Sequence, residues 1–300
     1  MKQYIDGLKT IQSKGVFEDA RTGVRRQRYH GLHMRFDTSE FLPIITTKKV
    51  ATRIIIEELL WFLKGRNDLR SLLEKNIHIW TPDAYREYKK RHPEGTYTIE
   101  SFEDKILSND LFSERHGDLG PIYGVQWRNR NGIDQIRRAF RLINEDHASS
   151  RIIVDAWNPS DLKDMALPPC HYSFQFTRIN DSLNVQVNQR SGDMFLGVPF
   201  NITSYSILLA LFAEVLDLKR GTFTHTITDA HIYETHTDAV NEQVSREVLA
   251  PSTTLTFSDK VKNYKYSDDT ISDFIDSLTI DDFVLDGYES HGVIKAELSV

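Results

Sequence analysis

Residues 189–201 read QRSGDMFLGVPFN, and the pattern of apolar residues changes across this stretch. Before it, Leu183, Val185 and Val187 alternate with polar residues, which is typical of a half-buried strand. After it, residues 200–216 are mostly apolar and are expected to form a central buried helix. Residues 221–233 return to an extended pattern. The sequence therefore predicts a strand, a helix and further extended structure around this turn.

The flanking sequence predicts more strands and helices. Tyr172, Phe174 and Phe176 alternate, so we expect a strand joined to the next one by a turn at Asn180-Asp181. Further strands are expected over residues 28–36, 151–157, 253–257 and 283–288. Helices are expected over residues 2–14, 52–64, 69–74, 133–144 and 235–248. This mixture predicts an α+β fold, a single domain over residues 1–300 with one large mixed β-sheet flanked by helices on one side.

Residues 81–116 differ from the rest of the chain. They are crowded with charged residues and Ser, and they include His92-Pro93-Glu94-Gly95. We interpret them as a small surface insertion that is partly helical around residues 83–90.

Composition excludes several classes of protein. The net charge of −6 argues against a general nucleic-acid binder, which presents a basic face. A single cysteine cannot form an intramolecular disulfide or a multi-cysteine zinc site, and no other metal site is expected. The chain starts without an apolar signal segment, and no apolar run approaches the roughly 18 residues of a membrane span. We therefore expect a cytoplasmic protein without a membrane segment.

The only cysteine follows two prolines in Leu167-Pro168-Pro169-Cys170-His171. Proline fixes the backbone, so the thiol is presented in one direction and can serve as a nucleophile. The alternative is a buried structural cysteine, which is the commoner fate of a free thiol.

Two other clusters carry polar groups that suit a ligand. Arg190 and Ser191 end a strand before a glycine turn and could bind an anion, or could simply form a salt-bridged strand end. Asn201 could cap the helix that follows, or read the edge of a base such as uracil. His231 and Tyr233 lie two apart on a strand and share a face, which suits a sugar hydroxyl or a satisfied core pair equally.

Taken together and in this order, these motifs resemble the thymidylate synthase family over nearly the whole chain apart from residues 81–116. The matching stretches are Arg21-Thr22-Gly23, 46–49, 58–63, Ile79-Trp80, 118–124, 156–158, 165–171, 189–201, 229–233 and the last residues up to Val300.

The resemblance implies reductive methylation of dUMP to dTMP, with 5,10-methylenetetrahydrofolate as the donor of the carbon and the hydride. It implies that Cys170 adds to C6 of the base and that Asn201 binds the uracil edge. His231 and Tyr233 would bind the ribose. The residues implied for the phosphate are Arg21, Arg190, Ser191 and, from the other subunit of a sheet-to-sheet homodimer, Arg151.

The same resemblance implies roles for proton transfer and for folate binding. Glu58, His171 and Tyr123 would hold the water network that moves the C5 proton. Folate would lie against Ile79, Trp80, Leu167, Gly197 and Phe200. Asp193 would bond the pterin, Lys48 would lie near the glutamate tail, and Val300 would close over the complex.

The chain departs from the family pattern at several positions. Ser150-Arg151 stands where the family usually has two arginines, and Arg25, Arg26 or Arg28 could compensate. Asp83 replaces a frequent second tryptophan, and Asn188 replaces a common tyrosine.

Two rival functions follow from the same scaffold. Asn188 gives weight to a dUMP hydroxymethylase, in which water replaces the hydride, whereas Trp80, Leu167 and Val300 favour methylation because they exclude water. A non-catalytic nucleotide- or RNA-binding relative would not need the intact Cys170, Glu58, Tyr123 and Asn201.

Overall fold

The computed structural model describes residues 1–20, 23–146 and 148–297. Within them, six strands form one sheet in the order β1-β2-β6-β5-β4-β3. The strands span β1 Val16–Asp19, β2 Arg25–Asp37, β3 Ile153–Asp155, β4 His171–Ile179, β5 Ser182–Asp193 and β6 Lys219–Tyr233. β5 and β6 run parallel, and the other neighbouring pairs in this sheet are antiparallel. The sheet is therefore mixed, as the sequence predicts.

The parallel pair is joined by the central helix α9, Gly197–Val215, which crosses from the end of β5 to the start of β6. This helix is long and apolar enough to cross a membrane by length and composition alone, but 78% of its apolar window is buried inside the fold. Phe212 of α9 stacks on Phe140 with ring centroids 3.7 Å apart. α9 is thus a core helix, and its burial explains why it is apolar on all sides.

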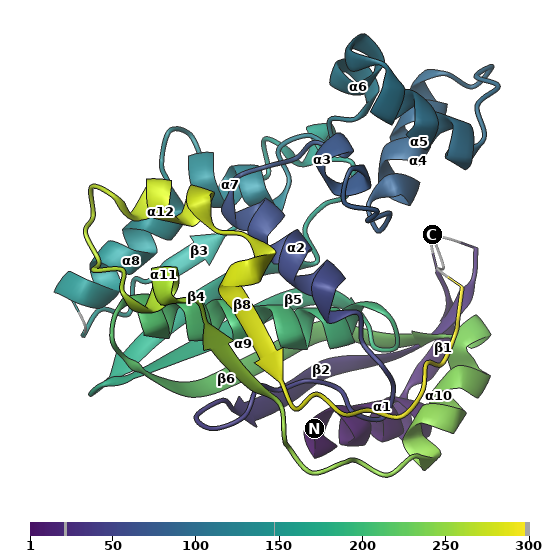
Figure 1. The fold of residues 1–300 in the computed structure, drawn as a ribbon. Coiled ribbons are helices and arrows are strands. Elements are labelled where there is room, and N and C mark those ends of the chain that lie inside the picture. Colours follow the sequence, from purple (N-terminus) through teal and green to yellow (C-terminus); the bar gives the residue numbers. More distant parts are fainter. Residues whose placement is uncertain (21–22, 147, 298–300) are drawn as a thin grey trace.

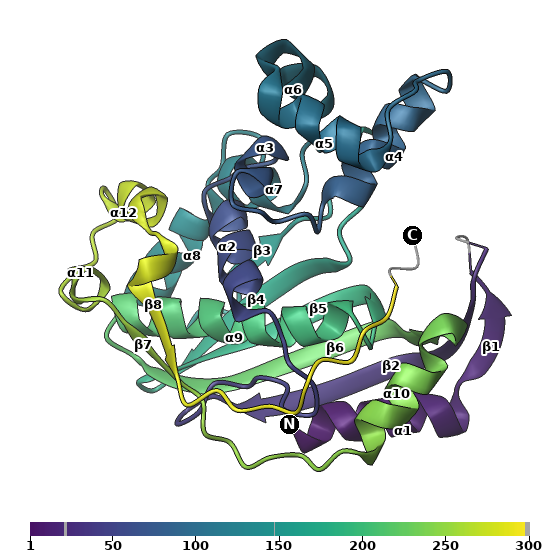
Figure 2. The same ribbon diagram turned by 45° about the vertical axis from the view of Figure 1, so that its right-hand side comes forward.

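Helices pack on α9 and on the inner strand β2. Figure 2 shows α9 lying along the sheet, with α2, Thr52–Leu63, on the side of α9 away from the strands. At the other end, α1, Lys2–Lys14, packs on β2 and on α10, Thr237–Ser245. The other helices here are α7 Tyr123–Asn129, α8 Gln135–Glu145, α11 Asp259–Lys262 and α12 Ile271–Ser277. A separate two-stranded sheet pairs β7, Thr254–Phe257, with β8, Phe283–Asp286.

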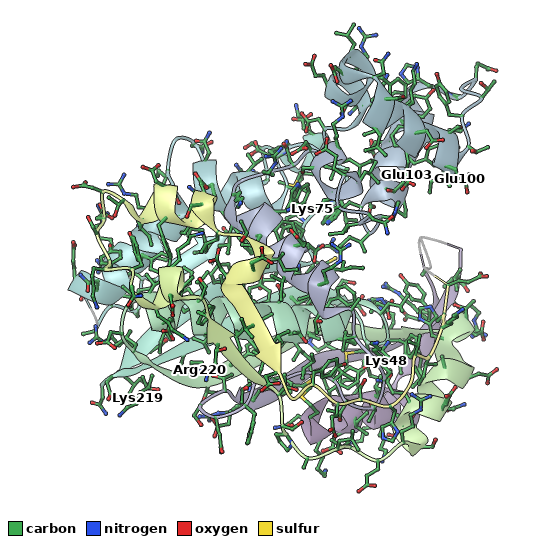
Figure 3. All side chains as sticks on the ribbon, in the orientation of Figure 1. Lys48, Lys75, Glu100, Glu103, Lys219 and Arg220 are labelled. Atoms are coloured by element: carbon green, nitrogen blue, oxygen red, sulfur yellow. The ribbon has the colours of Figure 1, made fainter. Side chains whose placement is uncertain are left out.

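Residues 81–116 form three helices that stand away from the main sheet in Figure 1. They are α4 Thr81–Arg91, α5 Ile99–Ser108 and α6 Asp110–His116, and the short α3, Arg70–Leu73, precedes them. Figure 3 shows Glu100 and Glu103 on α5 in this group, and Glu103 accepts a hydrogen bond from His78 at 2.8 Å. The helix expected around residues 83–90 is α4. The sequence did not predict α5 and α6, which are capped by Thr98 and Asn109.

Most expected elements are present with shifted ends, and one interpretation is wrong. α9 begins at Gly197 rather than near Asn201, so Asn201 lies inside the helix and is not its N-cap. The strand expected over residues 151–157 is the shorter β3, and the helix expected over 235–248 ends at Ser245. The strand expected over residues 253–257 is β7, which begins one residue later at Thr254, and the strand expected over residues 28–36 lies within the longer β2.

Candidate active site

The loop that carries Cys170, the predicted nucleophile, is fixed by hydrogen bonds on both sides. Cys170 immediately precedes β4, and its backbone N–H donates to the Tyr123 hydroxyl at 2.6 Å. The Cys170 carbonyl accepts from the backbone N–H of Arg190 at 2.8 Å. The Arg190 side chain closes the loop, because its Nε donates to the Pro169 carbonyl at 2.8 Å and its Nη2 to the Pro168 carbonyl at 2.7 Å. The two prolines therefore fix the guanidinium as well as the thiol.

The charge nearest to the thiol is that guanidinium. Arg190 Nη2 lies 3.7 Å from Cys170 Sγ. Burial raises the pKa of the Cys170 thiol, Arg190 lowers it, and the Asp83 carboxylate raises it again. The net shift is upward, and of these three influences the Arg190 guanidinium is the one that favours the thiolate form. A pocket lined by Trp157, Leu167, Pro168 and Arg190, among others, opens beside this loop.

Glu58 is positioned by α2, whose neighbouring residues Leu59 and Leu60 anchor it in the core. Its Oε1 accepts a hydrogen bond from the Trp80 indole at 2.8 Å. Burial raises the pKa of Glu58 to about 7, although the Trp80 hydrogen bond lowers it. A carboxyl group with a pKa near 7 can both take and give a proton at neutral pH.

His171 is held between two tyrosines. Its ring stacks on Tyr123 with centroids 4.2 Å apart, and its Nδ1 lies 2.7 Å from the Tyr205 hydroxyl. Burial lowers the pKa of His171 to about 3, with a smaller contribution from the nearby His225, so the imidazole is neutral. Sequence reasoning did not identify Tyr205. It lies four residues after Asn201 and hence on the same face of α9, which was the available signal.

Asn201 is oriented by a chain of amide and imidazole groups. Gln189 Nε2 donates to Asn201 Oδ1 at 3.2 Å and to the Ser191 carbonyl at 2.9 Å. Gln189 Oε1 lies 2.7 Å from His225 Nε2, and burial lowers the pKa of His225 to about 3. Neither Gln189 nor His225 was among the predicted site residues. Both residues are buried, so they orient Asn201 from the core of the fold.

Ser191, expected at the phosphate, and the two expected ribose residues share one face of the neighbouring strands β5 and β6, whereas Arg190, next to Ser191 in β5, points to the other face. Ser191 of β5 pairs with Asp229 of β6, and Asp193 pairs with His231. His231 Nδ1 lies 3.1 Å from the Asp229 carbonyl, and its ring is 5.1 Å from that of Tyr233. The predicted pair His231 and Tyr233 is thus brought beside Ser191.

The residues expected to contact folate come from the end of β5, the start of α9, the segment just before α4 and the loop before β4. Asp193 accepts hydrogen bonds from the backbone N–H groups of Phe195 and Leu196 at 2.9 and 3.2 Å. Burial raises the pKa of Asp193, but His236, whose Nδ1 lies 3.8 Å away, together with His231 and the Phe195 N–H, has the opposite effect, so the carboxyl pKa is lowered and the group is ionised. A side chain added at Gly197 would meet no described atom within 4 Å. Ile79, Leu167 and Phe200 are partly exposed and Trp80 is buried.

Lys48 is buried, although a residue that contacts the exposed glutamate tail of folate is expected to lie at the surface. It is 6% exposed, and its ammonium sits 3.5 Å from the centre of the Phe195 ring and donates to the Phe195 carbonyl. Burial lowers the pKa of Lys48 to about 8. Figure 3 places Lys48 on the side of the molecule that holds the main sheet, opposite Glu100 and Glu103.

Among the described residues, Arg151 is not brought to this site by its own chain. Arg151 is exposed just before β3, where its carbonyl accepts a hydrogen bond from Arg138 at 3.3 Å. Arg21 and Val300 lie outside the described residues. Within residues 1–20, 23–146 and 148–297, no group of three or more His, Cys, Asp or Glu residues is arranged to hold a metal ion.

Comparison with known proteins agrees with this arrangement. The family model described as thymidylate synthase matches residues 2–300. Curated proteins named thymidylate synthase are similar over the full length of both chains: 43% identical in Mycoplasma mobile, 42% in Malacoplasma penetrans and 40% in Mycoplasma genitalium. The chain therefore belongs to the thymidylate synthase family and is a methyltransferase.

Proposed function

We propose that this chain converts dUMP to dTMP by reductive methylation and that Cys170 is the nucleophile. The observation that carries the proposal is the position of Arg190, which is fixed by two proline carbonyls and lies 3.7 Å from the Cys170 sulfur. 5,10-Methylenetetrahydrofolate supplies the one-carbon unit and the hydride, and dihydrofolate is the second product. No metal or nucleic acid takes part.

The nucleotide is held between the face shared by Ser191 of β5 and the ribose residues of β6 and the Arg190 guanidinium, which lies beside Cys170. Arg190 and Ser191 bind the phosphate, and the arginine fork suits its oxygens. His231 and Tyr233 bind the ribose hydroxyl. Asn201 binds the uracil edge, and its orientation by Gln189 supports this role because a fixed amide discriminates between a donor and an acceptor on the base.

Covalent addition activates the base. The Cys170 thiolate forms a bond to C6, and the electron pair of the C5–C6 double bond moves so that C5 becomes a carbon nucleophile. Arg190 stabilises the thiolate before addition. The backbone hydrogen bond from Cys170 to Tyr123 holds the sulfur in one position, which reduces the entropy lost on reaching the reactive geometry.

Glu58 moves the C5 proton after the new carbon–carbon bond has formed. Its pKa of about 7 suits a base that must accept this proton and later release it. Neutral His171 and Tyr123 lie stacked beside each other and hold the intervening water.

The folate site fits the residues that surround it. The open space at Gly197 and the partly exposed Ile79, Leu167 and Phe200 form an apolar wall for a flat ring, and ionised Asp193 accepts from its N–H groups. Trp80 completes the wall and excludes water. Lys48 must leave its position on Phe195 to reach the glutamate tail, and Val300 is assigned to closing the site.

We also propose a sheet-to-sheet homodimer of cytoplasmic single-domain subunits, with residues 81–116 as an insertion. His33 and Arg35 are exposed on β2 between the buried Leu32, Met34 and Phe36, so one face of that strand remains open. We assign Arg151, which is exposed in the single chain, to the phosphate in the other subunit of this dimer.

Product analysis tests the proposed reaction. Incubation with dUMP and methylenetetrahydrofolate is expected to yield dTMP and dihydrofolate in equal amounts. Hydroxymethylated dUMP with free tetrahydrofolate would instead support the rival reaction. The structure gives that rival little support, because Asn188 hydrogen-bonds Ser173 and Gln186 rather than any residue assigned to the site.

A further inference from the structure

Three arginines lie at the start of β2, at positions 25, 26 and 28, and each has a different environment in the structure. The Arg25 side chain is half exposed and lies 3.8 Å from Asp19 and 3.3 Å from Glu234. It belongs to the surface of the molecule.

Arg28 is hydrogen-bonded to two carboxylates. Its Nε donates to Asp229 Oδ1 at 2.9 Å, and its Nη1 donates to Glu18. These two hydrogen bonds raise the pKa of Arg28 further above its usual range. Arg28 therefore has little capacity left for a ligand.

Arg26 is partly buried, and only some of its donors are satisfied. Its side chain is 19% exposed, and its Nη2 lies 3.2 Å from Asp229 Oδ2. Its Nε is buried and has no hydrogen-bond partner among the described residues. An unsatisfied buried donor costs free energy, so such a group in a folded protein calls for an explanation, of which an absent ligand is one.

The strand register places this arginine beside the nucleotide-binding face. Arg26 pairs with Tyr233, and Arg28 pairs with His231, so their side chains share a face with those two residues. From there the Arg26 side chain runs back along the strand to Asp229, which is the residue that pairs with Ser191. Its charge also acts on His231, where it lowers the imidazole pKa alongside the larger effect of burial.

We propose that Arg26 is a further substrate-binding residue whose guanidinium donates to the phosphate of dUMP. The inference rests on the proposed function, since it takes Ser191 as a phosphate ligand. A guanidinium presents several donors in a plane that matches phosphate oxygens. Asp229 remains paired with Arg28 when the Arg26 side chain turns toward the ligand, so this movement leaves the Asp229 carboxylate with a partner.

The test compares Arg26→Gln and Arg26→Lys with Arg25→Gln as the matched control. Calorimetry gives the Kd for dUMP without folate, so this measurement does not depend on turnover. Steady-state kinetics give kcat, the KM for dUMP and the Ki for inorganic phosphate as a competitor. Because Asp229 retains Arg28, Arg26→Gln is expected to fold, and Arg26→Lys keeps the charge if it does not.

Loss of a charge-assisted hydrogen bond is expected to raise the Kd for dUMP and the Ki for phosphate about tenfold or more in Arg26→Gln. The kcat should stay within about threefold, Arg26→Lys should fall between Arg26→Gln and the unmodified protein, and Arg25→Gln should change neither constant. Unchanged constants in the Arg26 variants would overturn the inference, as would a raised Kd for dUMP with an unaltered Ki for phosphate. Absence of dTMP formation by the unmodified protein would reject the proposed function but leave the calorimetric comparison valid.

Discussion

The indole N–H of Trp80 donates a 2.8 Å hydrogen bond to the carboxylate of Glu58. One side chain therefore lines the proposed folate wall and also contacts the proposed proton-transfer group. Closing the folate site and setting the proton affinity of Glu58 are thus coupled through a single contact.

Replacement of Trp80 tests this coupling. The hydrogen bond lowers the pKa of Glu58, so Trp80→Phe is expected to raise that pKa above about 7. Since the ionised carboxylate is the base, the acid limb of the kcat profile should move to higher pH by roughly one unit. Trp61→Phe is the control, because the Trp61 indole donates to Asp68 and Ser71 instead. An acid limb that stays in place in Trp80→Phe would separate Trp80 from Glu58.

The charge of Asp83 should be visible in the reactivity of the thiol. Asp83 raises the pKa of Cys170, so Asp83→Asn is expected to lower it and to increase the thiolate fraction at a given pH. Arg86, now without its carboxylate partner, would act in the same direction. The rate of alkylation of Cys170 by iodoacetamide near pH 7 should rise by roughly threefold to tenfold. Asp110→Asn, which removes an exposed carboxylate paired with Arg70, serves as the control, and equal rates in the two variants would refute the effect.

Gly120 lies just before α7, the helix of Tyr123, and packs against Asp164 in the loop that leads to Cys170. Its φ is +77°, and a Cβ there would lie 1.9 Å from the Asp164 carbonyl oxygen. Gly132 has a φ of +84° but no described atom within 4 Å of an added Cβ. Gly132→Ala is therefore expected to cost only about 1–2 kcal/mol of backbone strain, whereas Gly120→Ala adds a clash of about 1–3 kcal/mol.

Thermal unfolding and activity separate these two glycine variants. Gly120→Ala should show the lower Tm and a reduced kcat, because the loop at residues 164–170 must move. Gly132→Ala should retain full activity. Equal losses of activity in both would show that strain, and not displacement of the loop, is responsible.

Asn201 should decide which pyrimidine is accepted. Asn201→Asp replaces an amide by an acceptor, which suits the amino group of cytosine better than the carbonyl of uracil. The ratio of kcat/KM for dUMP to that for dCMP is expected to fall by about tenfold or more. Asn188→Asp, at a position bonded to Ser173, should leave the ratio unchanged. A ratio that does not move in Asn201→Asp would remove Asn201 from base recognition.

The sequence predicted those elements whose side chains alternate or repeat with one clear period. Phe174 and Phe176 on β4 and Val185 and Val187 on β5 are buried as their alternation indicates, and the turn at Asn180-Asp181 joins them. β1 was not predicted, because all four of its residues are exposed and carry no apolar period. The start of α9 was placed too late because Gly197 and Pro199 suggested a turn, yet both lie within the first turn of the helix.

The site residues that lie in sequence motifs could be predicted. Those whose role depends on a contact between distant parts of the chain could not. Glu58 and Trp80 lie in separate motifs, and their hydrogen bond depends on how two helices pack. Gln189, His225 and Tyr205 support Asn201 and His171 from the core, where polar residues give no local sequence pattern. The burial of Lys48 against Phe195 likewise follows from tertiary packing.

The most direct test of the whole account is the mass of the denatured protein after incubation with 5-fluoro-dUMP and methylenetetrahydrofolate. Fluorine at C5 cannot leave as the proton does, so the bond between sulfur and C6 should persist. We expect one nucleotide–folate adduct, located by peptide mapping at Cys170, and no adduct in Cys170→Ala. Turnover of dUMP by the Cys170→Ala protein, or an adduct on any other residue, would contradict the account.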